Sequence, residues 1–250
     1  MRPILTLLTD FGTADGYVAE MKGVLLSHLS EATIVDVSHD LAAGDVDGAR
    51  LTVARYWRRF PPGTVHLVVV DPGVGTARRA LAVSSEGRLL VGPDNGVLSP
   101  SLLAAGARAV SLAVPAGASP TFHGRDVFAP AAARLAMGAA VDALGDLCSD
   151  PEVRRTPEPR RHSDGTVEGQ VIAVDRFGNV ITNLMTRRDG TLEVAGERLP
   201  LRRTYGDAST GELVALTGSS GLVEIAVRDG SAAERLGLCR GAAVLLRPVG

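Results

Sequence analysis

The stretch Val68–Arg79, VVVDPGVGTARR, decides how this chain folds. Three consecutive β-branched residues lead into Asp71, and such a run is typical of a strand buried in a parallel sheet. Asp71 would then lie at the carboxyl end of that strand, where open α/β sheets bind their ligands. Gly73 and Gly75 let the backbone approach a ligand closely. A tight strand-to-helix turn is the alternative, because neither a P-loop lysine nor a third dinucleotide-type glycine follows.

The sequence before this stretch alternates between strand and helix patterns. Strands are predicted at 4–9, 32–38 and 65–70, with 32–38 and 65–70 buried, and helices at 17–28 and 45–56, the second with Asp45 as its cap. Such alternation indicates a mainly parallel sheet covered by helices.

Beyond the opening stretch the pattern changes to a hairpin and a further helix. Residues 80–85 and 88–92 are predicted to pair as a hairpin, and 92–99 to form a turn that enters a helix. Residues 125–137 are rich in alanine and predicted to be helical, with Pro130 close enough to the start to be tolerated.

The composition changes after Leu147, and this change marks a domain boundary. Residues 149–164 are charged and poor in apolar side chains, so we place a linker at 151–164, between domains 1–150 and 165–250. The last segment has short strand patterns separated by Gly, Asn and Asp turns. The sequence therefore predicts an α/β fold: a mainly parallel, helix-covered N-terminal sheet, followed by a smaller C-terminal all-β domain built as a barrel or a sandwich.

The composition excludes several classes of function. The 250 residues carry a net charge of −2 and only 4% aromatics, which argues against binding to nucleic acid or to an anionic membrane. We expect neither a transmembrane segment nor a signal peptide, because the apolar run 4–8 is stopped by Asp10. Cys148 and Cys239 have no disulfide or metal spacing, which fits a reducing cytoplasm.

Two further stretches accompany the opening one, TLLTDFGTADGYV at 6–18 and PTFHGRDVFAP at 120–130. Together they resemble the S-adenosylmethionine hydroxide adenosyltransferases, relatives of the fluorinase and chlorinase enzymes, over nearly the whole chain. The resemblance implies an enzyme in which water attacks the ribose C5′ of S-adenosylmethionine, releasing adenosine and L-methionine. It also implies a homotrimer whose sites lie between the N-terminal domain of one subunit and the C-terminal domain of the next. We expect no cofactor and no metal, because the substrate carries its own leaving group and the sequence has no ligand cluster.

By this resemblance Asp71, Arg78 and His123 match the set that prepares the attacking water, here called the Asp–Arg–His cluster. The chemistry needs such a set, because the sulfonium leaves readily but hydroxide is scarce at neutral pH. Arg78 would stabilise developing hydroxide, and either Asp71 or His123 would take the proton. A structural histidine beside a turn is the alternative for His123, and Arg79 is interpreted as a solvated neighbour of Arg78.

The resemblance also assigns substrate contacts to the N-terminal loop. Asp10 of the DFGTAD pattern would bind the ribose diol, whose hydroxyls can both donate to a carboxylate. The alternative is that Asp10 only caps the turn that follows it. Asp15 and Tyr17 would face the methionine part.

In the C-terminal domain the stretch VDRFGNVITN supplies three candidates. Phe177 would stack on adenine, Asn179 would bind the adenine edge, and Asp175 would accept from the α-ammonium group. The alternative is a hairpin turn with Phe177 in the core. In TGSSGLVEIAV, Ser219 and Ser220 would hold the substrate carboxylate or the backbone turn. Glu224 is either a substrate contact or a structural strand residue.

Two other functions remain to be weighed. A halide-using adenosyltransferase is disfavoured, because the halogenating relatives carry an uncharged aromatic in place of Asp71 and hydroxyl residues where this chain has Val74 and Gly124. A binding module that does not turn its ligand over is disfavoured by the intact Asp–Arg–His cluster. The sequence assigns no role to the remaining histidines, His28, His39, His66 and His162.

Overall fold

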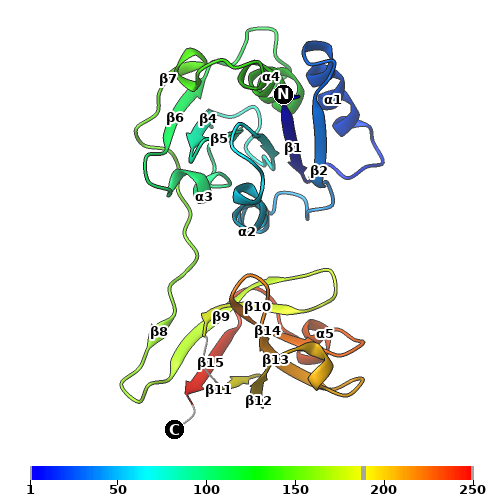
Figure 1. Ribbon diagram of the computed structural model, residues 1–250, viewed down its shortest axis with the longest axis vertical. Coiled ribbons are helices and arrows are strands. Elements are labelled where there is room, and N and C mark those ends of the chain that lie inside the picture. The colour runs from blue at the N-terminus through cyan, green and yellow to red at the C-terminus, as the bar shows by residue number, and fades with distance from the viewer. Residues whose placement is uncertain (1, 187–189, 249–250) are drawn as a thin grey trace. The chain divides into compact units, whose positions relative to one another are not determined.

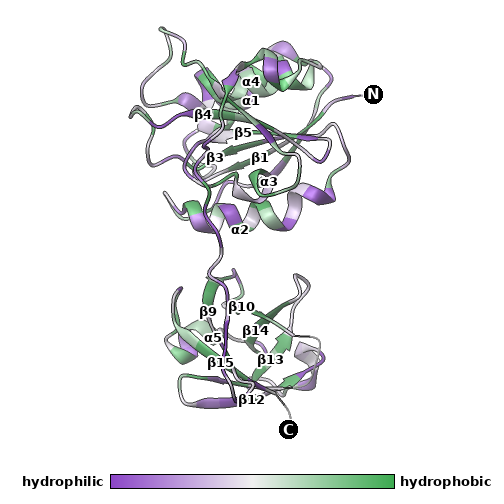
Figure 2. Ribbon diagram, turned by 90° about the vertical axis from the view of Figure 1, so that its left-hand side faces the viewer, coloured by the Kyte–Doolittle hydropathy of each residue, from purple (hydrophilic) through white to green (hydrophobic). Residues whose placement is uncertain are grey.

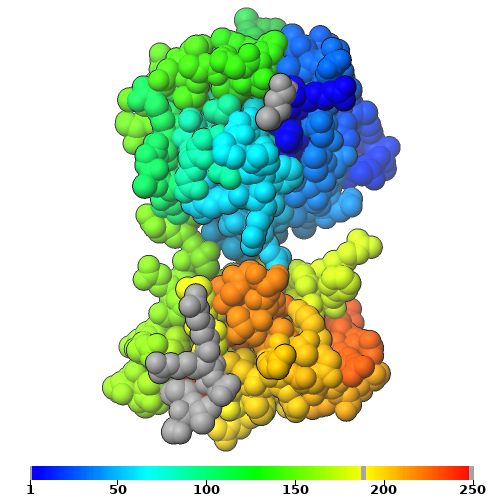
Figure 3. All heavy atoms as spheres, viewed as in Figure 1, coloured from blue at the N-terminus to red at the C-terminus, as the bar shows by residue number. Residues whose placement is uncertain are grey.

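The computed structural model describes residues 2–186 and 190–248 (Figure 1). They form two compact units, which divide between Arg155 and Thr156. On the face drawn in Figure 3, side chains cover the elements of each unit closely. Within the described ranges, none of the helices is long and apolar enough to cross a membrane.

In the first unit, the described residues up to Arg155 form a sheet with the strand order β2-β1-β3-β5-β4-β6-β7. Its strands are β1 (Ile4–Thr9), β2 (Thr33–Ser38), β3 (Val65–Val69), β4 (Ala80–Ser85), β5 (Arg88–Pro93), β6 (Arg108–Leu112) and β7 (Gly145–Leu147). Its helices are α1 (Tyr17–His28), α2 (Val46–Tyr56), α3 (Ser99–Leu102) and α4 (Ala129–Ala136), with 3₁₀ turns at Trp57–Arg59 and Val141–Ala143.

The sheet is parallel in one half and antiparallel in the other. β2, β1, β3 and β5 run parallel to one another, whereas β5, β4, β6 and β7 are antiparallel neighbours. The predicted parallel arrangement therefore holds for the half that contains β3. It does not hold for the other half, where β4 and β5 form a hairpin and β6 and β7 add to the sheet as antiparallel neighbours. The hairpin predicted from 80–85 and 88–92 is confirmed as β4 and β5.

The valine run at the end of β3 is buried on both faces of the sheet. All five residues of β3 are buried, as predicted. Leu67 and Val69 pack in a core with α1 and α4, whereas Val68 and Val70 pack in a second core with α2 and Trp57. Figure 2 shows these helices on opposite faces of the strands. Because successive side chains of a strand point to opposite faces, a strand covered on both sides is apolar throughout.

β2 differs from its prediction, whereas the start of α2 agrees with its prediction. β2 was expected to be buried, but all six of its residues are at least partly exposed. The reason is that β2 lies at the edge of the sheet and has a neighbouring strand on one side only. Asp45 is confirmed as the cap of α2, because its side chain accepts a hydrogen bond from Gly48 N at 3.0 Å.

The helix predicted at 125–137 consists of two structures joined end to end. Gly124–Phe128 form a π turn that closes with a hydrogen bond from Ala129 N to the Gly124 carbonyl. The α-helix that follows, α4, begins only at Ala129. Pro130 lies in the first turn of α4, directly after the π turn. Single π turns of this kind are frequent at functional sites.

The second unit, from Thr156 onward, is a β-barrel. Its described strands are β8 (Arg160–Arg161), β9 (Val167–Val174), β10 (Val180–Met185), β11 (Gly190–Val194), β12 (Glu197–Arg202), β13 (Leu213–Thr217), β14 (Leu222–Val227) and β15 (Ala243–Pro248), with α5 at Ala232–Leu236 and a 3₁₀ turn at Tyr205–Asp207. The order β10-β14-β13-β12-β11-β15-β9 closes on itself, because β9 also pairs with β10. β8 pairs with the start of β9. Of the two predicted arrangements, the barrel is the one observed.

The stretch predicted as a linker, 151–164, is shared between the two units. Arg154 N donates to Ser99 Oγ at 2.8 Å, and Val153 forms a β-bridge with Gly96. The start of the stretch therefore packs on the first unit. Its later part belongs to the second unit, since it contains β8.

Arg79 holds this stretch in place, which corrects its interpretation as a solvated neighbour of Arg78. The Arg79 guanidinium donates to Asp94 at 2.7 Å, and to the carboxylate and carbonyl oxygens of Asp150 at 2.6 and 2.7 Å. Asp94 is buried and also accepts from Glu152 N at 2.6 Å. The adjacent arginines thus serve different parts of the molecule.

Candidate active site

Asp71 and Arg78 form a buried ion pair just beyond the carboxyl end of β3. Arg78 Nε donates to Asp71 Oδ1 at 3.1 Å, and Nη2 donates to Oδ2 in a second hydrogen bond. The Arg78 and Asp71 side chains are only 7% and 5% exposed. A bidentate pair fixes the plane of the guanidinium as well as its distance. Arg78 Nη1 donates in addition to the Arg79 carbonyl at 2.9 Å, so the cation is held from two sides.

His123 completes the cluster from a distant part of the chain. Its Nδ1 lies 3.3 Å from Arg78 Nη2, and its side chain is buried. A guanidinium has no acceptor, so in this hydrogen bond Arg78 donates and Nδ1 accepts. The neutral imidazole therefore carries its proton on Nε2. The structure brings together the three residues that the sequence singles out for water activation.

Gly75 explains how the two loops of the cluster meet. Its φ is +77°, and a β-carbon on it would lie 2.5 Å from the Pro120 carbonyl oxygen. Only glycine fits so close to another backbone. The sequence predicts a close backbone approach here. The partner at Gly75 is the chain's own loop before His123, whereas the prediction expected a ligand.

Burial and charge act in opposite directions on the Asp71 carboxyl. Burial raises the pKa of Asp71 above its ordinary value, and the neighbouring Arg78 and His123 partly oppose this rise. The ring of Phe128 lies 5.4 Å from the Arg78 guanidinium carbon and forms an apolar wall. A carboxyl group, a fixed cation and an imidazole thus meet at one point, an arrangement able to polarise a bound water molecule.

Asp10 lies one strand away from Asp71. It follows β1, which pairs in parallel with β3 through Thr9 and Val69, so both carboxylates are at the same edge of the sheet. Asp10 Oδ2 accepts from Gly44 N at 2.7 Å. This hydrogen bond does not cap the turn that follows Asp10, which was the alternative interpretation, because it reaches the loop before α2.

His39 is a residue of this region that the sequence analysis missed. Its ring is buried, with Nδ1 2.8 Å from Thr9 Oγ1, and its carbonyl accepts from Gly12 N at 2.7 Å. His39 therefore fastens both ends of the segment that carries Asp10. Its position just after the strand next to β1 was the available signal.

Asp15 and Tyr17 lie where the same loop enters α1, and both are exposed. The Tyr17 ring centroid is 5.9 Å from that of Phe11 and 5.4 Å from that of Phe122. Phe122 directly precedes His123 in the chain. An aromatic cluster therefore links the predicted methionine contacts to the loop of the Asp–Arg–His cluster.

Gly124 leaves little room for the hydroxyl side chain expected in halogenating relatives. A β-carbon on Gly124 would lie 3.2 Å from Met21 Sδ and 3.2 Å from the Phe122 ring. A serine here would require these neighbours to move.

In the second unit, the predicted adenine-binding residues form one tight turn. Asp175 Oδ1 accepts from the backbone N–H groups of Phe177 and Asn179, each at 2.9 Å, and Oδ2 accepts from Asn179 Nδ2 at 3.0 Å. Phe177 is 76% exposed, so the alternative of a core phenylalanine is wrong. Gly178 packs against Ser231, the cap of α5, which supports the turn from behind.

The other candidates of this unit lie on and below the turn before β14. Ser219 and Ser220 are exposed, whereas Glu224 is buried and accepts from Tyr205 Oη at 2.9 Å. Gly218 is required beside it, because a β-carbon there would overlap the Glu224 carboxylate. The 175–179 turn directly precedes Val180, the first residue of β10, which pairs with Ile225 of β14. The turn with Ser219 and Ser220 precedes Leu222, the first residue of β14, which pairs with Met185 at the end of β10. The two sets of candidates therefore lie near opposite ends of β10.

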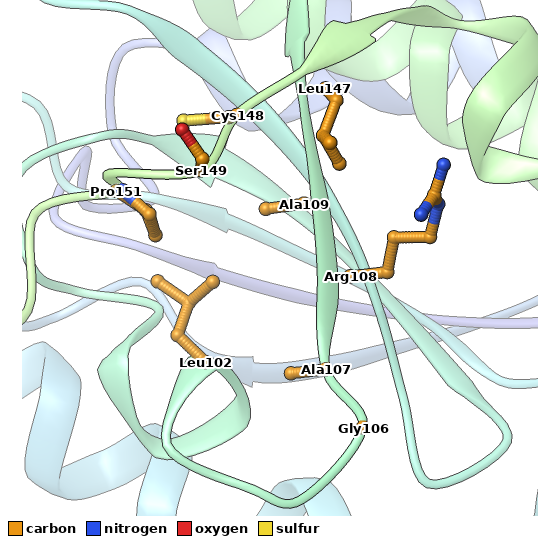
Figure 4. A pocket seen from close by; sticks show the side chains of 9 residues that line it. All are labelled: Leu102, Gly106, Ala107, Arg108, Ala109, Leu147, Cys148, Ser149 and Pro151. Atoms are coloured by element: carbon orange, nitrogen blue, oxygen red, sulfur yellow. The ribbon is translucent and has the colours of Figure 1, made fainter.

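A surface hollow of about 480 Å³ lies elsewhere in the first unit, beside β6 (Figure 4). Leu102, Ala109 and Pro151 point toward it in the close-up. Cys148 also lines it, and burial raises the pKa of that thiol. The predicted site residues lie in other parts of the described chain. Across residues 2–186 and 190–248, no three His, Cys, Asp or Glu side chains are grouped to hold a metal ion.

Comparison with known sequences places this chain in one enzyme class. Residues 5–145 match the SAM hydroxide adenosyltransferase N-terminal domain, and residues 169–245 match the SAM hydroxide adenosyltransferase C-terminal domain. The chain belongs to the SAM hydroxide adenosyltransferase family.

Individual relatives agree along almost the full chain. The (R)-S-adenosyl-L-methionine hydrolase of Thermus thermophilus is 42% identical, covering 98% of this chain and 100% of the relative. The fluorinase of Actinopolyspora mzabensis is 31% identical, covering 97% and 96%. A crystal structure of an uncharacterized conserved protein from Thermotoga maritima aligns with a TM-score of 0.87 at 33% identity, covering 97% of this chain and 99% of that one.

Proposed function

We propose that this chain hydrolyses S-adenosylmethionine to adenosine and L-methionine, by attack of water at the ribose C5′. The observation that carries the proposal is the buried Asp–Arg–His cluster at the carboxyl edge of the sheet. Support also comes from the relatives named as hydrolases, which are more similar in sequence than the fluorinase.

The geometry of the cluster suggests a division of labour. Arg78 would stabilise the hydroxide that develops as the water loses its proton. His123 has its Nδ1 facing the Arg78 donor, so its Nε2–H can orient the water but cannot accept the proton. The carboxylate of Asp71 is then the proton acceptor, since each oxygen retains a lone pair after bonding to Arg78. As the new C–O bond forms, the C5′–S bond breaks and its electron pair leaves with methionine.

The binding assignments belong to the same proposal. Asp10 would hold the ribose, and the exposed Tyr17, with Asp15, would contact the methionine part. In the second unit, Phe177 and Asn179 would bind adenine. The amino-acid end would be bound by the remaining candidates, Asp175, Ser219, Ser220 and Glu224.

The relatives' names add a stereochemical element. They specify the (R) form, so we propose that this chain acts on the (R)-sulfonium epimer in preference to the (S) epimer. Separate incubation with each resolved epimer tests this, and faster turnover of the (S) form contradicts it.

The proposal also includes a homotrimer, with sites shared between subunits, working in the cytoplasm without metal or cofactor. Support for the shared site is that the candidate residues are distributed over both units. Sedimentation equilibrium tests the trimer, and a fully active monomer contradicts it. Activity is expected to survive a chelator. Loss of activity that only a divalent metal restores contradicts the metal-free reaction.

The decisive experiment is incubation with S-adenosylmethionine in ¹⁸O-water, followed by mass analysis of the products. Label in the adenosine 5′-oxygen is expected. Turnover that requires chloride, with 5′-chloro-5′-deoxyadenosine as product, would support the halide-using alternative. Binding without product over a long incubation would support a non-catalytic module.

A further inference from the structure

Arg125 lies two residues after His123, in the π turn, and takes no direct part in the proposed chemistry. Its Nε donates to Asp126 Oδ1 at 2.6 Å, and its Nη2 donates to Asp126 Oδ2 at 3.0 Å. Its Nη1 donates to Glu20 Oε2 at 2.8 Å. One guanidinium thus binds a carboxylate of its own turn and a carboxylate in the first turn of α1.

Asp126 extends this connection across the loop that carries His123. Its Oδ2 also accepts from Ser119 N at 2.8 Å, which closes the loop from 119 to 126. The hydrogen bond from Arg125 holds the pKa of Asp126 below its ordinary value, so the carboxylate stays ionised and keeps both partners. The loop is therefore tied at its beginning and its end to one charged centre.

The Arg125 guanidinium also covers the aromatic side of the same loop. Its carbon lies 5.0 Å from the centroid of the Phe122 ring. The Phe122 ring contacts Tyr17, at the start of α1, with 5.4 Å between centroids. Two of the contacts of Arg125, with the carboxylate of Glu20 and with the Phe122 ring, thus connect the His123 loop to α1.

His123 needs such support, because its turn is irregular and, among the described residues, its side chain has one hydrogen bond, that from Arg78. The N–H groups of both Arg125 and Asp126 reach back to the Phe122 carbonyl, and the π turn begins directly after His123. The bond from Arg78 to Nδ1 is long, at 3.3 Å. A small rotation of the turn would break it.

We propose that Arg125 is a positioning residue that holds His123 against Arg78 by tying the His123 loop to α1. This inference rests on the proposed function for its kinetic test. Arg125 is 35% exposed and Glu20 is 46% exposed, and ion pairs at that exposure contribute little to stability. The network therefore acts on the geometry of the loop.

The chain offers a closely matched control. Arg58 donates to Glu86 through two hydrogen bonds of 2.8 and 2.7 Å, and its guanidinium carbon lies 4.5 Å from the Trp57 ring centroid. It has the same bidentate carboxylate and aromatic contact as Arg125, and it lies in the 3₁₀ turn Trp57–Arg59 after α2. Lysine at either position keeps the charge and loses the fork geometry.

The kinetic test compares Arg125→Lys with Arg58→Lys at saturating S-adenosylmethionine. Arg125→Lys is expected to lower kcat about 10-fold, less than the ~10²-fold cost of a 1 Å misplacement, with KM within about twofold. In a His123→Ala background the same substitution should have no further effect, because the group it positions is gone. Arg58→Lys should change neither background. An equal loss from Arg125→Lys in both backgrounds overturns the proposal.

A second readout does not depend on activity. In the substrate-free protein, ¹⁵N NMR of the imidazoles should show the His123 signals displaced by Arg125→Lys and by Glu20→Gln, and unchanged by Arg58→Lys. Unmoved His123 signals in both Arg125→Lys and Glu20→Gln overturn the proposal. If the wild-type protein yields no adenosine, the proposed function fails while this measurement still decides the positioning. If the wild-type protein is active and Arg125→Lys keeps its kcat, the positioning alone is wrong.

Discussion

Gly75 lies so close to Pro120 that a β-carbon on the glycine would be 2.5 Å from the proline carbonyl oxygen. This approach joins the loop after β3 to the loop that carries His123. The Asp–Arg–His cluster thus depends on a backbone contact that tolerates no side chain.

Gly75→Ala is expected to destabilise the fold and to lower kcat together. The substitution adds strain at a φ of +77° and a collision with Pro120, for a combined cost of about 1–3 kcal/mol in unfolding free energy. Gly63→Ala is the control, because Gly63 has a φ of +85° but nothing within 4 Å of a β-carbon. It should show the backbone cost without the loss of kcat. Equal kcat values for the two variants would show that the contact does not hold the cluster.

Substitutions in the cluster should affect kcat more than binding. Arg78→Ala and His123→Ala are each expected to lower kcat about 10²–10³-fold, because they act on a water that becomes charged only as it reacts. Asp71→Ala should behave in the same way. The double variant should lose much less than the product of the single losses, since the groups act as a unit.

Asp10→Ala and Asn179→Ala should instead raise KM, because ribose and adenine do not change charge during the reaction. Single-turnover kinetics at saturation, together with direct binding, separates the two classes. Wild-type turnover by saturated Arg78→Ala and His123→Ala would make the Val68–Arg79 stretch a binding loop and not a catalytic one.

The acid limb of the pH profile should report Asp71. Burial raises the pKa of this carboxyl, so kcat/KM should begin to fall at a higher pH than an ordinary aspartate would give. Arg78→Gln removes the cation that lowers the pKa, and the limb should then move to still higher pH. Arg79→Gln is the matched control, because Arg79 pairs with Asp94 and Asp150. A limb that stays in place in Arg78→Gln would assign it to another group.

Much of the fold follows from local patterns that a sequence displays directly. The valines of β3 predict a strand covered on both faces, and Asp45 predicts the start of α2. The antiparallel half of the sheet was harder to predict, because β5 inserts between β3 and β4 and no local pattern reveals strand order.

The site residues divide in the same way, into those that a sequence motif reveals and those that it does not. Asp71, Arg78 and His123 lie in recognisable motifs, whereas Arg125 with Glu20 gain their roles from contacts across a separation of 105 residues. His39 is another such case, since it acts through Thr9. Contacts of this kind depend on the folded structure and leave no periodic signal in the sequence.

Phe177→Ala is expected to weaken binding of adenosine without destabilising the barrel. Phe177 is 76% exposed, so its removal should change the unfolding free energy by less than about 0.5 kcal/mol. Stacking of a base on an aromatic ring is worth about 1–3 kcal/mol, which predicts a marked rise in the adenosine Kd. Met185→Ala is the control, because Met185 is 75% exposed at the other end of β10. An adenosine Kd unaffected by Phe177→Ala, measured by calorimetry, would remove Phe177 from the site.

His66 should make the stability of the first unit depend on pH. The ring is fully buried, with Nδ1 2.8 Å from Thr6 Oγ1, and burial together with the charge of Arg88 lowers its pKa to about 4 from an ordinary 6.5. Between pH 6.5 and about 4, His66 therefore binds a proton in the unfolded chain but not in the folded chain. The stability that neutral His66 allows is fully present above pH 6.5 and is lost as the pH falls toward 4.

A shift of this size corresponds to about 3 kcal/mol of unfolding free energy across that range. His66→Gln removes the titrating ring but keeps an amide able to bond to Thr6, so denaturant unfolding should show a shallower decline toward acid pH. His28→Gln removes an exposed histidine at the end of α1 and should leave the decline as in the wild type. If His66→Gln and the wild type lose stability in parallel between pH 6.5 and 4, the acid sensitivity lies in other groups.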